Sequence, residues 1–145
     1  MRAVFDRYSP ILDLDEAISE PDAEFGETVH RVYRLLAEAF SREPRVAPAM
    51  LAEGLARPTE PAVLALLQYH VPRMLAGVGQ WLAGEVTAGR VRDLPLPLLI
   101  QQMLAPIAIH TMVRPAAVNI PEIELPELDE ACVVFADAFL RAVAI

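Results

Sequence analysis

The spacing of apolar residues is the feature that most constrains the fold of this chain. Every long segment repeats its apolar residues at the three- and four-residue intervals of an α-helix, and none alternates as a β-strand does. We therefore predict an all-α fold of about five to six helices in a single domain, residues 1–145. After a helix end at 1–8 and a linker at 11–19, the expected helices cover about 20–42, 46–56, 60–88, 97–114 and 127–143.

Boundary signals support these limits. Ser19 with Asp22 three residues later predicts a helix start near residue 20, and Thr59 predicts the N-cap of the long helix. Gly89 suits the left-handed conformation that closes a helix, and the two prolines that follow it suit the first turn of the next helix. Prolines at 72 and 106 lie inside predicted helices and predict kinks, because proline removes a backbone hydrogen bond.

The last two predicted helices carry more apolar surface than a single-chain core uses. Apolar residues cover nearly the whole circumference of 97–114, and 127–143 has two adjacent apolar stripes. A helix that is apolar on all sides is buried on all sides. We interpret one face as core and the other as part of a four-helix bundle between two subunits. The residues predicted at this interface are Leu99, Gln102, Pro106, Leu128, Cys132, Phe135 and Phe139.

Composition argues against several classes of protein. The net charge is −8 and the twelve basic residues, all arginine, are scattered, which disfavours nucleic-acid binding by this chain alone. The single cysteine excludes an internal disulfide framework. No stretch reaches the roughly 18 uncharged apolar residues of a membrane span, and the N-terminus lacks a signal-peptide pattern. We therefore expect a cytoplasmic protein with no membrane association.

No catalytic, metal or cofactor site is predicted. Glu27 and His30 form one Glu-x-x-His pair, but a di-iron helical bundle needs two such pairs. Neither His70 nor His110 has a glutamate three residues before it. The serines at 9, 19 and 41 lie at helix boundaries, where capping accounts for them. We therefore do not expect an enzyme.

Four segments resemble the ligand-binding half of TetR-type (tetracycline-repressor) transcription regulators. The segment M-R-A-V-F-D-R-Y resembles the helix that leads out of the family's DNA-binding domain. The segment L-L-A-E-A-F-S-R-E-P, followed by M-L-A-E-G-L, resembles the family's LxxxFxxxP…LxxEA pattern. The GxxR…DP link between its long pocket helix and its first dimerisation helix is similar to V-T-A-G-R-V-R-D-L-P, and its C-terminal segment is similar to D-A-F-L-R-A-V. The chain departs from the family pattern in three places. Leu94 separates Asp93 from Pro95, Pro72 lies inside the long helix, and no glycine precedes Val143.

The resemblance implies an effector-binding and dimerisation domain. Such a domain forms a homodimer and binds a small, mostly apolar effector, which it couples allosterically to a DNA-binding domain that this chain does not contain. The family's helix-turn-helix would precede residue 1; a chain cut at the domain boundary, a start codon assigned too late and a repressor without a DNA reader each fit that expectation. A ligand-independent helical scaffold or antagonist that dimerises with full-length regulators is the alternative function.

Effectors of this family lie in a cavity walled by the long helix and the helix that follows it. One flank of the predicted helix 60–88 combines a histidine, a methionine, a glycine and a tryptophan, which suits an apolar ligand. Ordinary helix packing is the alternative interpretation of each side chain. The residues expected to line the cavity are Val63, His70, Met74, Gly77, Trp81, Gln101 and His110.

Overall fold

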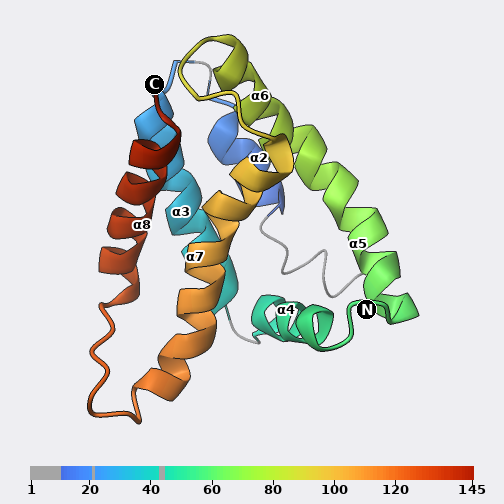
Figure 1. Ribbon diagram of the computed structural model, residues 1–145, viewed down its shortest axis with the longest axis vertical. Helices are drawn as coiled ribbons and strands as arrows, with labels where there is room; N and C mark the ends of the chain where they lie inside the picture. Colours follow the sequence, from blue (N-terminus) through green and yellow to red (C-terminus); the bar gives the residue numbers. More distant parts are fainter. Residues whose placement is uncertain (1–10, 21, 43–44) are drawn as a thin grey trace.

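The computed structural model describes residues 11–20, 22–42 and 45–145, and its described side chains begin at Leu14 (Figure 1). The all-α prediction is confirmed, and the described residues form no β-strand beyond a single bridge between Val91 and Ala144. The helical elements are α2 (Ile11–Ile18), α3 (Phe25–Ser41), α4 (Val46–Ala56), α5 (Pro61–Met74), the π-helical turn η1 (Leu75–Gly79), α6 (Gln80–Thr87), α7 (Leu96–Ala117) and α8 (Leu128–Val143). The helix end predicted at residues 1–8 lies outside the described residues.

The linker predicted at 11–19 is wrong, because this segment forms the helix α2. Leu14 and Ala17 occupy one face of α2 and are buried. That face packs against α3 and against η1. An eight-residue segment is too short for its apolar period to stand out in the sequence, and its helical conformation depends on this tertiary packing.

Two predicted helix caps are also wrong. The N-cap of α3 is Glu24 and the N-cap of α5 is Glu60, and neither side chain makes a capping hydrogen bond. The expected caps Ser19 and Thr59 therefore lie outside these helix starts. At the other end of the long helix the prediction is confirmed, since Gly89 has a φ of 76°. Only glycine adopts this left-handed conformation without strain.

The long helix predicted at 60–88 consists of α5, η1 and α6 in direct succession. Pro72 lies inside α5, and the hydrogen-bond pattern changes from α to π three residues later. Pro72 lacks a backbone N–H, so one rung of the α-helical ladder is missing at this point. A π-turn inserts an extra residue into the helix, which changes the direction of the side chains that follow it.

The core lies around α3, which packs against α8, α7 and α2. Its residues Val29, Val32, Tyr33 and Leu36 are fully covered. In contrast, α5 makes close backbone contact chiefly with its own continuation η1, and α4 has no buried residue. Figure 1 shows α5 diverging from α7, with α4 lying across the lower end of the gap. This divergence leaves room for the cavity described below.

Among the described residues, α7 is the one helix that is long and apolar enough to cross a membrane. Only 39% of its apolar window is buried, yet α7 packs against α3 and α8 and carries much of the core. Core helices of soluble proteins share this length and composition, so α7 is weak evidence for a membrane span.

Three of the seven residues predicted at a subunit interface lie in the core instead. Leu99, Cys132 and Phe139 are 0%, 3% and 4% exposed. The thiol of Cys132 donates a hydrogen bond to the carbonyl oxygen of Tyr33 over 3.6 Å, and the ring of Phe139 meets the ring of Tyr33 edge-on. Covered by their own chain, these three side chains offer no surface to a second subunit, so their prediction is wrong. Of the other four, Gln102 is exposed, and Pro106, Leu128 and Phe135 are half-buried.

Candidate ligand-binding site

Side chains from α2, α3, α4, α5 and α7 line a partly open cavity of about 370 Å³. Among the described residues no charged side chain lines it, and His70 is the single polar one. We call this space the apolar cavity. Its wall on α5 consists of Val63, Leu66, Leu67, His70, Val71 and Met74.

The apolar cavity exists because α4 covers the gap between α5 and α3 with small or flexible side chains. Ala47 and Gly54 add little volume, and Met50 can change its shape with the contents of the cavity. A Cβ atom at Gly54 would meet only the side chain of Val63, at 3.9 Å. Several lining residues keep substantial contact with solvent, among them Leu67, which is 48% exposed. The lining therefore retains apolar surface that a ligand can cover.

His70 supplies the one polar group of the apolar cavity. Its side chain is buried, and its ring lies edge-on to the ring of Tyr69 with 4.7 Å between centroids. A neutral imidazole carries one hydrogen-bond donor and one acceptor. His70 is therefore the side chain of the described lining that can form hydrogen bonds.

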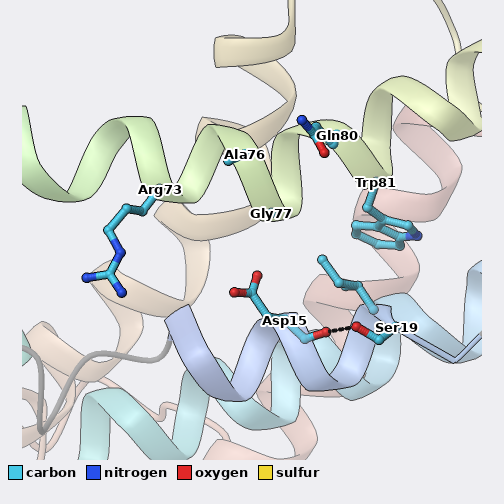
Figure 2. Close-up of a pocket in the computed structure, with 8 residues that line it drawn as sticks. Asp15, Ser19, Arg73, Ala76, Gly77, Gln80 and Trp81 are labelled. Carbon is cyan, nitrogen blue, oxygen red and sulfur yellow. Dashed lines mark hydrogen bonds between the residues drawn. The ribbon is translucent and has the colours of Figure 1, made fainter.

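A second, more open cavity of about 610 Å³ lies between α2 and the stretch from Arg73 to Trp81 (Figure 2). Asp15 and Ile18 of α2 line it, together with Ser19. Because it contains charged groups from both walls, we call this space the polar cavity.

The residues predicted on one flank of the long helix are divided between these two cavities. Val63, His70 and Met74 line the apolar cavity, whereas Gly77 and Trp81 line the polar cavity. The structure therefore does not bring these five residues together in one cavity. The division follows from α2, which was expected to be a linker but packs on η1 and contributes Leu14 to one cavity and Asp15 to the other.

Gln101 and His110 line neither of the two cavities. Gln101 is exposed on α7, and the buried ring of His110 lies edge-on to the ring of Phe135 on α8, 5.9 Å between centroids. The α7 residue that reaches the apolar cavity is Leu104, which the sequence analysis did not select. In a helix that is apolar on nearly every side, periodicity does not distinguish Leu104 from its neighbours.

The contribution of α4 was missed as well. Its residues Met50, Leu51 and Gly54 line the apolar cavity. The signal available was the sequence V-A-P-A-M-L-A-E-G-L-A, in which small and flexible residues stand where a core helix would carry bulky ones. This pattern predicts a helix that covers a space without filling it.

The described residues contain no group of three or more metal-ligating side chains. His30, of the Glu-x-x-His pair, instead places its Nε2 atom 3.0 Å from Oδ1 of Asp137 and so links α3 to α8. Burial raises the pKa of the Cys132 thiol, with Asp129 adding to the effect, which disfavours its reactive thiolate form.

No family model, curated protein or solved structure matches this chain.

Proposed function

We propose that the chain is a cytoplasmic effector-binding and dimerisation domain of the TetR type, which binds a small, mostly apolar ligand in the apolar cavity. The observation that carries this proposal is a cavity of about 370 Å³ whose lining, in the described part of the chain, contains no charged residue. Small-molecule sites in proteins commonly measure roughly 300–1,000 Å³ and are largely apolar, with a few polar groups that orient the ligand.

The lining favours an uncharged ligand. A charged group in this cavity would lose hydration without meeting an opposite charge, which is strongly unfavourable. An apolar ligand would instead cover the half-exposed side chains of Leu67 and Val71. Each Å² of apolar surface removed from water contributes roughly 25 cal/mol. Shape and apolar area therefore determine the affinity, and His70 provides one directional contact.

Coupling to a DNA-binding domain would run through α2. Leu14 of α2 and Met74 of α5 both line the apolar cavity, and α2 also packs on η1. A ligand that changes the separation of these two residues would shift α2, which directly follows residues 1–10. Bound ligand should therefore slow amide hydrogen exchange in α2. Unchanged exchange in α2 at saturating ligand would argue against this route.

A second copy of the chain is the proposed partner, bound through an apolar face on α7 and α8. The face consists of exposed residues other than those selected from the sequence. It is formed by Leu98, Ile109 and Val113 on α7 and by Val133 and Val134 on α8. Two such faces packed together would form a four-helix bundle.

The ligand-binding proposal can be tested with N-phenyl-1-naphthylamine, an uncharged probe whose fluorescence rises in apolar surroundings. We expect saturable binding to the parent chain. Leu67→Glu introduces a charge into the lining and should weaken binding at least tenfold, about 1.4 kcal/mol. Leu67 is 48% exposed, so the variant should fold, which circular dichroism can verify.

Leu64→Glu is the matched control, because Leu64 lies on the same helix, is 40% exposed and does not line the apolar cavity. It should bind the probe like the parent chain. Equal weakening by both substitutions would show that the probe binds elsewhere. Absence of binding to the parent chain would favour the ligand-independent scaffold.

A further inference from the structure

A glycine of α4 leaves part of the apolar cavity unfilled. Gly54 is the one glycine among the described lining residues, and Ala47, Met50 and Leu51 of the same helix line the cavity as well. Residues three, four and seven positions apart share one face of a helix, so Gly54 continues this face by one turn. A side chain at position 54 would therefore extend toward the cavity.

Neither backbone conformation nor close packing requires glycine at position 54. Gly89 is the one described residue with a left-handed backbone, and Gly54 lies inside α4. Among the described atoms, a Cβ atom at Gly54 would meet only Val63, at the ordinary van der Waals distance of 3.9 Å. Glycine is less favourable than alanine inside a helix. What the missing side chain provides is volume in the cavity.

The side chains around this volume are aliphatic. Val63 lies next to Gly54 on the α5 side, and Leu66 and Leu67 follow one turn later on α5. Val63 is 6% exposed and β-branched, so its side chain is stiff and this part of the wall has a fixed position. A polar group placed here would lose hydration without gaining a hydrogen bond from these side chains. The volume beside Gly54 therefore suits a saturated hydrocarbon group.

We infer that Gly54 sets the size limit of the ligand, and that the ligand carries an aliphatic chain whose end lies beside Gly54 and Val63. This inference rests on the proposed function. The cavity is partly open, and Leu67 and Val71 keep contact with solvent, so the polar end of an uncharged chain can stay in water while its tail is covered. A larger side chain at position 54 would occupy the place of the tail end. It would exclude long ligands and admit short ones.

Straight-chain primary alcohols test this inference, because they are uncharged and differ from one another only in length. Isothermal titration calorimetry compares the binding of 1-hexanol, 1-octanol and 1-decanol. In the parent chain we expect the affinity to rise about fourfold with each added methylene group, which is the gain from burying that group. Gly54→Leu should bind 1-hexanol within twofold of the parent chain and 1-decanol at least tenfold more weakly. Equal weakening of all three alcohols, or no weakening of 1-decanol, overturns the inference.

Gly84→Leu is the matched control, because it also replaces a helical glycine by leucine. Gly84 lies on α6, does not line the apolar cavity, and an added Cβ there meets no described atom within 4 Å. This variant should bind 1-decanol like the parent chain. Equal loss of 1-decanol binding in Gly54→Leu and Gly84→Leu would contradict the role assigned to Gly54.

Gly54→Ala adds the smaller group. Its Cβ fits without displacing Val63, so the variant should fold, and it should weaken 1-decanol binding less than Gly54→Leu does. Circular dichroism and retained 1-hexanol binding verify the fold of both variants. If Gly54→Leu does not fold, the comparison of 1-hexanol with 1-decanol in Gly54→Ala decides, and tighter binding of 1-decanol than by the parent chain overturns the inference.

Binding of N-phenyl-1-naphthylamine separates this inference from the proposed function. A parent chain that binds neither this probe nor any of the three alcohols has no ligand site in the apolar cavity, and both proposals fail. A parent chain that binds the probe but no alcohol retains the proposed function and overturns the inference alone. Loss of 1-decanol with retained 1-hexanol in Gly54→Leu supports both.

Discussion

His110 is a polar side chain in a region that is otherwise nearly apolar. It is 7% exposed, its ring packs on Phe135, and its Nε2 atom has no hydrogen-bond partner among the described residues. Burial lowers the pKa of His110 below its ordinary value, and the positive charge of Arg114 adds to the effect. The folded protein therefore favours the neutral imidazole.

This shift predicts a loss of stability at mildly acidic pH. The unfolded chain binds a proton at His110 near its ordinary pKa of about 6.5, whereas the folded chain resists protonation until a lower pH. The free energy of unfolding should therefore fall as pH drops below about 6.5, by at most roughly 1.4 kcal/mol per pH unit from this residue. Urea unfolding at several pH values between pH 5 and pH 8 measures this change in the free energy of unfolding.

The control for this prediction is a pair of histidine variants. His110→Gln should show a shallower pH dependence than the parent chain. His30→Gln should keep the contribution of His110, because His30 lies on α3 and contacts Asp137. If the free energy of unfolding of His110→Gln depended on pH as steeply as that of the parent chain, burial of His110 would not be the cause of the acid destabilisation.

At the scale of the element, α7 shows how two adjacent residues acquire different roles. Leu98 is 50% exposed and Leu99 is fully buried. The sequence pattern predicts Leu99 at a subunit interface, because an evenly apolar helix does not reveal which side faces its own chain. The side of α7 that is buried is determined by α3 and α8, the helices on which α7 packs.

Leu99→Ala should destabilise the folded chain by about 2–5 kcal/mol, since it removes buried methyl groups and leaves a cavity in the core. The adjacent substitution Leu98→Ala should change stability by less than about 0.5 kcal/mol where the monomer predominates. Chemical denaturation at low protein concentration compares the two. Similar losses in both variants would contradict the assignment of Leu99 to the core.

At the scale of the whole molecule, the apolar face of α7 and α8 remains uncovered by the described chain. Ile109 and Val113 lie four residues apart on α7 and are about half exposed. Leu98 continues the same stripe eleven residues earlier, three helical turns away. Exposed apolar residues gathered on one side of a helix are typical of a surface that a partner covers.

Ile109→Glu should therefore shift the chain from dimer to monomer, because it places a charge in the proposed interface. The side chain is 51% exposed, so the fold should persist. Sedimentation velocity over a range of concentrations measures the change, with Leu64→Glu as a control that keeps the dimer. A parent chain that stays monomeric at high concentration, or a dimeric Ile109→Glu, would exclude this face as the interface.

Of the candidate site, the sequence identified Val63, His70 and Met74, which share one flank of α5 and meet in the apolar cavity. The partners of these residues could not be predicted. Leu104 comes from a helix with no distinctive face, and Met50 from a short helix that contributes nothing to the core. A cavity is defined by all its walls, and these walls are far apart in the sequence.

The amino-acid sequence alone predicts the helical character of the chain, the limits of α4 and the helix end at Gly89. These depend on local properties, namely the period of apolar residues and the backbone freedom of glycine. Packing between distant segments makes residues 11–18 a helix, buries Leu99 rather than Leu98 and places α2 between two cavities. Periodicity shows that a helix has apolar faces, but it does not show which segment covers each face.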